Sequence, residues 1–230
     1  MTSIADPLWV MDSGLGEPAF NMAIDEALLA SSTTRDRAVL RFYGWTEPAA
    51  TFGYFQHHTE VASRTRIRPL IRRPTGGGIV PHLRDWTYSL SVPPAHPWHR
   101  MRAVDSYRTM HEWIVRAFAG IQIATELAPC CRKDAPGACF EGYEQFDVLW
   151  QGRKIAGAAQ RRNQLGLLIQ GSVQPPTTCE RAEWQSAMLR EIPRTQFPAF
   201  EACTPDADLL ERASGLAQFK YATEAYNRLR

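Results

Sequence analysis

The chain has 230 residues, of which 44% are hydrophobic and 22% are charged. This length and composition predict one globular domain over residues 1–230 with one substantial core. The net charge is only +2 and the basic residues are scattered, which argues against a nucleic-acid partner. The sequence has neither an apolar run of about 18 residues nor a secretory signal, so we expect a cytoplasmic protein that does not bind a membrane. The five cysteines lack the spacing of a disulfide framework or a metal site, and neither is expected.

The first part of the chain predicts one helix and then strands. Apolar residues at helical spacing predict a helix over residues 18–29, with Asn21 as its N-cap. Aromatic and β-branched runs over residues 39–45 and 50–55 predict two strands joined by a turn. The polar stretch over residues 56–68 is compatible with one short helix.

A run of three glycines, at positions 76–78, lies between predicted strands at residues 70–73 and 86–92. A loop of this kind can approach a ligand closely, and its N–H groups can face a carboxyl or phosphate oxygen. The run matches neither the dinucleotide-binding pattern nor the P-loop pattern, so neither of those folds is indicated. The alternative is a plain glycine-rich turn between two strands.

The second part of the chain predicts helices around a β-meander. The predicted helices are residues 106–119, 181–191 and 207–216, and the predicted strands are residues 145–150, 154–160 and 167–173. The first two of these strands form a hairpin around a Gln151-Gly152 turn. A short helical C-terminal segment is expected to begin at about residue 177.

Three side chains near these elements carry the chemistry that the sequence offers. Lys154, one of only three lysines, begins a strand after a tight turn, where a fixed ammonium could bind an acyl carbonyl or an acyl phosphate. Cys139 precedes the hairpin, and a neighbouring ammonium would make its thiol a better acyl-accepting nucleophile. His82 follows the glycine loop, where it could orient a ligand or carry a proton. A surface lysine, a buried cysteine and a structural histidine are the alternatives.

Several longer motifs in order resemble the lipoate ligase and octanoyltransferase family, in particular its cysteine-dependent octanoyltransferases. The similarity runs from about Trp9 to Asn227. The motifs that carry it are residues 12–14, 18–29, 41–45, 53–56, 72–78 (Arg-Arg-Pro-Thr-Gly-Gly-Gly) and 152–161 (Gly-Arg-Lys-Ile-Ala-Gly-Ala-Ala-Gln-Arg).

This resemblance implies an α/β fold, a single catalytic domain with a mixed sheet flanked by helices, shared with biotin ligases and related to class II aminoacyl-tRNA synthetases. It implies Cys139 as the nucleophile and Lys154 as the contact to the acyl carbonyl. The implied substrate-binding residues, around an apolar acyl tunnel, are Arg73, Thr75, Gly76, Gly77, Gly78, His82, Gly157 and Ala158.

Two reactions fit the resemblance. The first takes an octanoyl group from octanoyl-acyl carrier protein onto Cys139 and passes it to a lysine of a lipoyl domain or the glycine cleavage H protein, without a cofactor. The second is ATP-dependent lipoate ligation through lipoyl-AMP, which would require ATP and Mg²⁺. Cys139 favours transfer, whereas Gly78 is closer to the ligases, because the transferases commonly carry arginine there. A non-catalytic relative that binds acyl carriers is a third hypothesis, and the presence of both Cys139 and Lys154 argues against it.

The chain departs from the family pattern at two positions. The family places an aspartate directly after the loop histidine, whereas Leu83 follows His82 here and Asp85 lies three positions after it. The family also carries His-Gly-Ser on the third meander strand, where this chain has Gln170-Gly171-Ser172. A proton-transfer role therefore cannot be carried over to these positions from the resemblance.

Overall fold

The computed structural model describes residues 6–133, 142–176 and 179–230. Its larger sheet has eight strands in the order β13-β1-β2-β6-β12-β11-β10-β7: Phe200–Ala202, Leu8–Gly16, Val39–Trp45, Trp86–Val92, Gly166–Val173, Arg153–Asn163, Val148–Trp150 and Glu126–Leu127. Strand β1 is parallel to both β13 and β2, and the remaining neighbours are antiparallel. The mixed sheet that the resemblance implies is therefore confirmed.

Two smaller sheets accompany the large one. The first has the order β4-β3-β5: Leu70–Arg72, Ala49–Phe52 and Val80–His82. The second pairs β8, Arg132–Lys133, with β9, Gly142–Tyr143. The helices are α1 (Pro18–Ala30), α2 (Ser32–Arg35), α3 (His58–Arg64), α4 (Pro97–Arg100), α5 (Ala103–Ala119), α6 (Arg181–Arg190), α7 (Ala207–Leu216), the π-helical η1 (Ala217–Tyr221) and α8 (Glu224–Asn227). None of the helices in the described ranges is long and apolar enough to cross a membrane.

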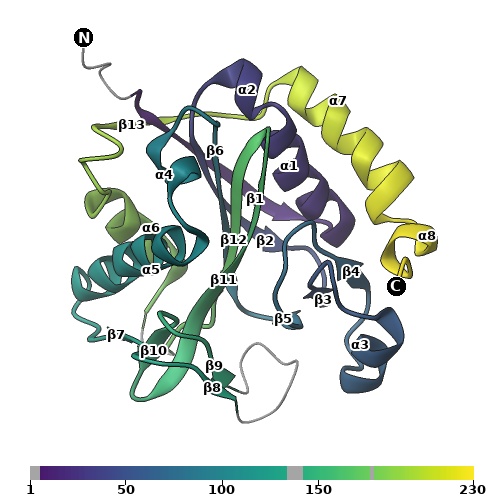
Figure 1. Ribbon diagram of the computed structural model, residues 1–230, viewed down its shortest axis with the longest axis horizontal. Helices are drawn as coiled ribbons and strands as arrows, with labels where there is room; N and C mark the ends of the chain where they lie inside the picture. Colours follow the sequence, from purple (N-terminus) through teal and green to yellow (C-terminus); the bar gives the residue numbers. More distant parts are fainter. Residues whose placement is uncertain (1–5, 134–141, 177–178) are drawn as a thin grey trace.

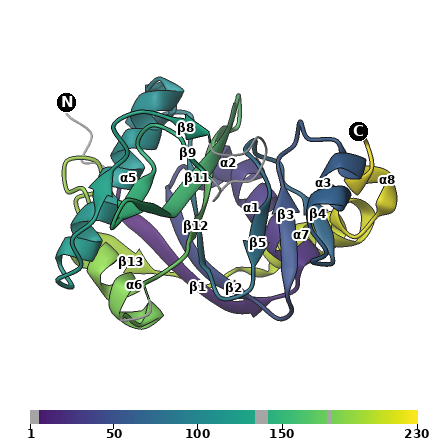
Figure 2. The same ribbon diagram turned by 90° about the horizontal axis from the view of Figure 1, so that it is seen from below.

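The large sheet lies between two layers (Figures 1 and 2). Helices α5 and α6 cover one face, and α1, α7 and the three-stranded sheet lie on the other. Each layer has its own core because each sheet face and its helices bury apolar side chains. Trp113 of α5 and Trp184 of α6 are fully buried in the first core, and Met22 and Leu28 of α1 pack in the second.

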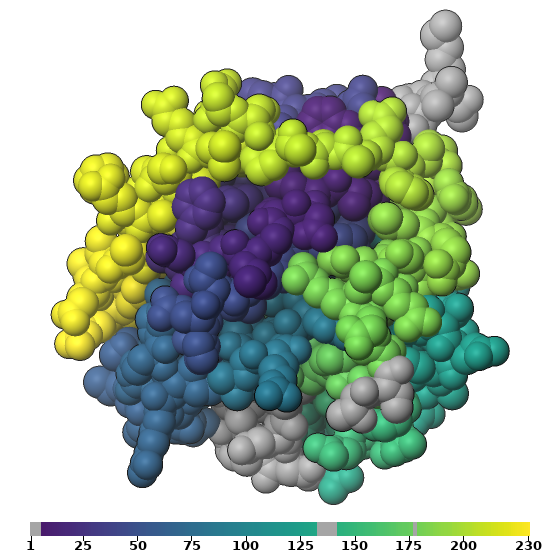
Figure 3. All heavy atoms as spheres, turned by 180° about the vertical axis from the view of Figure 1, so that it is seen from behind, coloured from purple at the N-terminus to yellow at the C-terminus, as the bar shows by residue number. Residues whose placement is uncertain are grey.

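Both ends of the chain contribute to this layering. The C-terminal helices, in yellow, border the N-terminal segments, in purple, on the face seen in Figure 3. The side chain of Arg72, on β4, donates to the backbone oxygens of Tyr226 and Asn227, at 3.2 and 3.0 Å. The C-terminal segment is thus held against the strand that leads into the glycine loop.

Most of the predicted elements are confirmed, and the differences have physical reasons. Asn21 is not an N-cap, because α1 begins three residues earlier at Pro18 and the Asn21 side chain instead donates to the Gly16 and Gly44 carbonyls. The strands predicted at residues 39–45 and 50–55 are both present, but the second ends at Phe52, and β2 and β3 belong to different sheets. Helix α5 begins at Ala103 rather than at residue 106.

Candidate active site

Arg73 holds the glycine loop in place through hydrogen bonds to its backbone. The Arg73 guanidinium donates to the backbone oxygens of Gly76 and Gly78, at 2.9 and 2.8 Å. Gly77 has a φ of 86°, a conformation that favours glycine. A Cβ atom on Gly53 would lie 2.0 Å from the Gly77 oxygen, so the loop packs directly on the backbone after β3. The loop is therefore fixed by its neighbours.

Lys154 is fixed by the hairpin that the sequence predicted. Gln151 and Gly152 both have positive φ, 51° and 73°, which is the geometry of a type I′ turn between antiparallel strands. Lys154 follows in β11, and its Nζ lies 2.8 Å from the Asp147 carboxylate. Its side chain is only 8% exposed. It is therefore not a solvated surface lysine.

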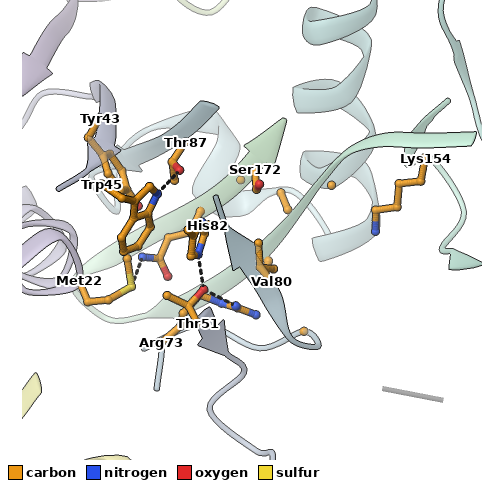
Figure 4. A pocket seen from close by; sticks show the side chains of 16 residues that line it. Met22, Tyr43, Trp45, Thr51, Arg73, Val80, His82, Thr87, Lys154 and Ser172 are labelled. Carbon is orange, nitrogen blue, oxygen red and sulfur yellow. Dashed lines mark hydrogen bonds between the residues drawn. The ribbon is translucent and has the colours of Figure 1, made fainter. Parts of the chain in front are cut away.

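Lys154 and Gly77 of the glycine loop line the same cavity, whereas Gly76 and Gly78 do not line it (Figure 4). Arg73, His82, Gly157 and Ala158, all implied by the resemblance, line it as well. The remaining lining residues are Met22, Tyr43, Trp45, Thr51, Val80, Thr87, Ala159, Gln170, Gly171 and Ser172. In the close view, Lys154 lies at one end, and Met22, Tyr43 and Trp45 lie at the other.

The free space in this cavity is about 40 Å³. Cavities that hold small organic ligands are roughly 300 to 1,000 Å³, so an acyl chain requires side chains to move. Met22 is suited to that, because its thioether side chain is unbranched and adaptable.

His82, on β5, is connected to Arg73 through the hydroxyl of Thr51, on β3. Its Nδ1 lies 2.8 Å from the Asp85 carboxylate, and its Nε2 lies 2.7 Å from the Thr51 hydroxyl, which accepts from Arg73 at 2.8 Å. A carboxylate accepts, so Nδ1 donates to Asp85, and the Thr51 hydroxyl, which can donate or accept, forms a hydrogen bond with Nε2. Trp45 stacks on the imidazole with 3.8 Å between ring centroids. Both ring nitrogens are engaged, an arrangement suited to orienting Arg73.

A buried hydrogen-bond network is centred on Asp25 of α1, and two of its members, Tyr43 and Gln170, line the cavity. The carboxylate accepts from Arg41 at 2.8 Å, Ser89 at 2.6 Å, Tyr43 at 2.8 Å and Gln170 at 2.7 Å. Burial, followed by the charge of Asp25, raises the pKa of Tyr43 well above its usual value, so its hydroxyl remains a donor. The network connects α1 with three strands of the large sheet.

Gln170 extends this network to the glycine loop. Its amide nitrogen donates to Asp25, and its amide oxygen accepts from the Thr75 hydroxyl at 2.7 Å. An amide can donate and accept at once, which is why it can bridge a carboxylate and a hydroxyl. Thr75 thus anchors the loop to the sheet, and it does not line the cavity itself.

The assembled site offers a fixed cation and a backbone loop around one cavity. An ammonium and oriented N–H groups stabilise the negative charge that develops on a carbonyl oxygen under attack. Within the described ranges, no group of three or more His, Cys, Asp or Glu side chains could hold a metal ion. Cys139, the predicted nucleophile, lies outside the described residues.

A family model, the lipoyl protein ligase A/B catalytic domain, matches residues 17–182. The chain belongs to this family. Its match to the octanoyltransferase LipM of Bacillus subtilis is 34% identical over 176 residues, covering 71% of the chain and 63% of that protein. Its match to the LipM of Kyrpidia tusciae is 35% identical over 179 residues, covering 71% of the chain and 64% of that protein. The matched region therefore spans just under two thirds of each relative.

Solved lipoate ligases share the fold. A putative lipoate protein ligase from Thermoplasma acidophilum superposes with a TM-score of 0.78 at 21% identity, covering 99% of this chain and all of that one. A lipoate-protein ligase A solved with ATP also gives a TM-score of 0.78 at 21% identity, covering 98% of this chain and 99% of that one. The biotin/lipoate ligase-like fold expected from the sequence is thus confirmed.

In this member of the lipoyl protein ligase A/B family, the structure accounts for both departures from the family pattern. Leu83 is exposed, and Asp85 supplies the carboxylate to His82 from three positions on. Gln170 makes both hydrogen bonds that connect Asp25 to Thr75. The sequence reasoning missed Thr51 and Asp147. Neither belongs to a motif that marks it, because each reaches the site only through the packing of strands.

Proposed function

We propose that the chain transfers an octanoyl group to the lysine of a lipoyl carrier domain, through a thioester on Cys139. The observation that carries the proposal is the shared cavity of Lys154 and Gly77, in a chain whose relatives at 30–35% identity are named octanoyltransferases. The acceptor class is supported by an archaeal bipartite lipoate protein ligase solved in a study of that ligase and its E2 lipoyl domain, which shares the fold with a TM-score of 0.72 at 23% identity. The proposed donor is octanoyl-acyl carrier protein.

The first step exchanges one thioester for another. The Cys139 thiolate attacks the carbonyl carbon of the donor thioester, a new C–S bond forms, and the donor thiolate leaves and takes up a proton. The Lys154 ammonium and the N–H groups of the glycine loop stabilise the oxyanion between these events. Thioester exchange is close to neutral in free energy, so the proposed step needs no ATP.

The second step forms an amide. The neutral amine of the acceptor lysine attacks the Cys139 thioester, the C–N bond forms, and the C–S bond breaks. The amine loses a proton, and the cysteine returns as a thiolate or thiol. Lys154 acts on the same carbonyl oxygen in both steps because the acyl group keeps its place in the cavity.

The main test is intact-mass spectrometry of the protein mixed with octanoyl-acyl carrier protein without ATP. The proposal expects a gain of one octanoyl group, which a Cys139→Ser variant does not show, followed by its transfer to an apo lipoyl domain. A Cys139→Ser protein that lipoylates the acceptor from ATP, Mg²⁺ and free lipoate would instead establish the ligase reaction. A protein that binds the carrier but shows neither reaction would be a non-catalytic relative.

A further inference from the structure

We infer that Asp147 is a positioning residue for the reaction, which acts by holding the Lys154 ammonium over Gly157. The inference rests on the proposed function for the role of Lys154. Asp147 directly precedes β10, and its carboxylate lies 2.8 Å from Lys154 Nζ. Asp147 does not line the cavity, so it reaches a bound acyl group only through Lys154.

The carboxylate is itself held rigidly. Asp147 is fully buried, and its side chain accepts from the Glu144 backbone N–H at 2.7 Å and from the Tyr107 hydroxyl of α5 at 2.5 Å. Its own backbone N–H donates to the Glu144 oxygen at 3.1 Å, which closes a tight turn around the carboxylate. Three donors from three parts of the chain, including Lys154, therefore meet on one side chain.

Two titratable side chains beside the pair, Tyr107 and His111, are uncharged at neutral pH. Burial, followed by the charge of Asp147, raises the pKa of Tyr107 well above its usual value, so Tyr107 stays neutral and donates. Burial lowers the pKa of His111, whose ring lies 4.2 Å from that of Tyr107, to about 4, so it is uncharged at neutral pH. A buried charge without a partner is strongly unfavourable, which favours a tight Asp147–Lys154 pair over a mobile ammonium.

The absence of a side chain at Gly157 leaves the space that the lysine and the carboxylate occupy. A Cβ atom on Gly157 would lie 2.6 Å from Lys154 Cε, 2.7 Å from Nζ and 3.0 Å from Asp147 Oδ1. The lysine side chain thus folds over a glycine before it reaches the carboxylate. An ammonium has three donors at fixed angles, so fixing one on Asp147 also sets the directions of the others.

The energetic reason is preorganisation. Lysine carries a flexible four-carbon stem, and an ammonium that must be ordered during the reaction stabilises an oxyanion less than one already in place. A displacement of about 1 Å at a reacting centre can lower a rate by about 100-fold. Asp147→Asn keeps the shape of the side chain and removes its charge, so kcat should fall by about that factor while KM changes little.

The kinetic test is a double-mutant cycle in the octanoyl-transfer assay. Asp147→Asn is expected to lower kcat in the wild-type protein. In the Lys154→Met background it should leave kcat unchanged within about twofold. Tyr107→Phe, which removes one donor from Asp147 and leaves its charge, is expected to give a smaller loss of kcat. Glu26→Gln is the matched control. The Glu26 carboxylate lies 2.6 Å from Lys220 Nζ, and neither residue lines the cavity, so this variant should leave kcat unchanged.

A spectroscopic readout tests the inference independently of activity. The chain has only three lysines, so lysine-selective ¹³C labelling gives one side-chain signal for each, which Lys→Arg variants assign. Asp147→Asn should shift the Lys154 signal and spare that of Lys220, and Glu26→Gln should do the opposite. Unfolding temperatures of all variants show whether each remains folded.

The two proposals can fail separately. If the protein uses ATP and lipoate instead of an octanoyl thioester, the proposed function is wrong, and the same cycle in the lipoylation assay still tests Asp147. If octanoyl transfer occurs but Asp147→Asn retains the natural kcat, or lowers it equally in the Lys154→Met background, the inference about Asp147 is wrong. An unchanged Lys154 signal in a folded Asp147→Asn protein would likewise overturn it.

Discussion

Replacing Asp25 with asparagine should strongly destabilise the protein. The Asp25 carboxylate is fully buried and accepts four hydrogen bonds, from Arg41, Tyr43, Ser89 and Gln170. Asparagine has nearly the same shape, but it removes the charge that balances the buried Arg41 guanidinium and turns an NH₂ group toward groups that donate. Removing one partner of a buried ion pair costs about 3–5 kcal/mol, because the other charge stays buried without compensation.

The free energy of unfolding from urea denaturation measures this loss directly. In a chain of this size, about 3–5 kcal/mol corresponds to a fall in Tm of about 6–20 °C. The control is the double variant Asp25→Asn/Arg41→Met, which keeps an accepting oxygen at position 25 and removes the uncompensated guanidinium, and it should be less destabilised than Asp25→Asn. A single variant that loses less than about 1 kcal/mol, or a double variant that is the less stable of the two, would refute the reasoning from an uncompensated guanidinium.

Three further predictions follow from the site and the core. Lys154→Arg should lower octanoyl transfer by about 100-fold or more with little change in Tm, because a planar guanidinium cannot replace a point charge folded over a glycine; near-natural turnover would contradict this. Gly53→Ala should displace the glycine loop, since its Cβ would lie 2.0 Å from the Gly77 oxygen, and transfer assays should show lost activity even where circular dichroism shows an intact fold; full activity would show that the loop can adjust. The pKa of His111 is lowered by burial to about 4, whereas an unfolded histidine titrates at about 6.5, so the unfolded state binds the extra proton between these values. The free energy of unfolding should therefore fall by up to about 3 kcal/mol as the pH drops from about 6.5 toward 4. Urea denaturation of a His111→Phe variant over the same pH range should show a smaller fall; an equal fall in both proteins would mean that other groups cause the pH dependence.

The sequence alone predicted many of the elements because their patterns are local. The apolar spacing of α5, the alternation along β6 and the Gln151-Gly152 turn each depend on neighbouring residues only. Strand β1 was not predicted, because its second half, Asp12–Gly16, has the composition of a loop and pairs in the sheet after a register shift. Strand β5 is three residues long and contains Pro81, so its pattern is too short to recognise.

The family, the glycine loop and Lys154 could be recognised from contiguous motifs, whose residue types are required by close backbone approach and by a fixed positive charge. The distant side chains that support them became visible only once the strands were placed in space. Asp85 reaches His82 across a turn, and Asp147 reaches Lys154 across a hairpin. Gln170 connects the loop to Asp25 from a central strand. Such partners have no fixed spacing, because a buried polar group needs a partner nearby in space and the order of the strands determines which residue that is.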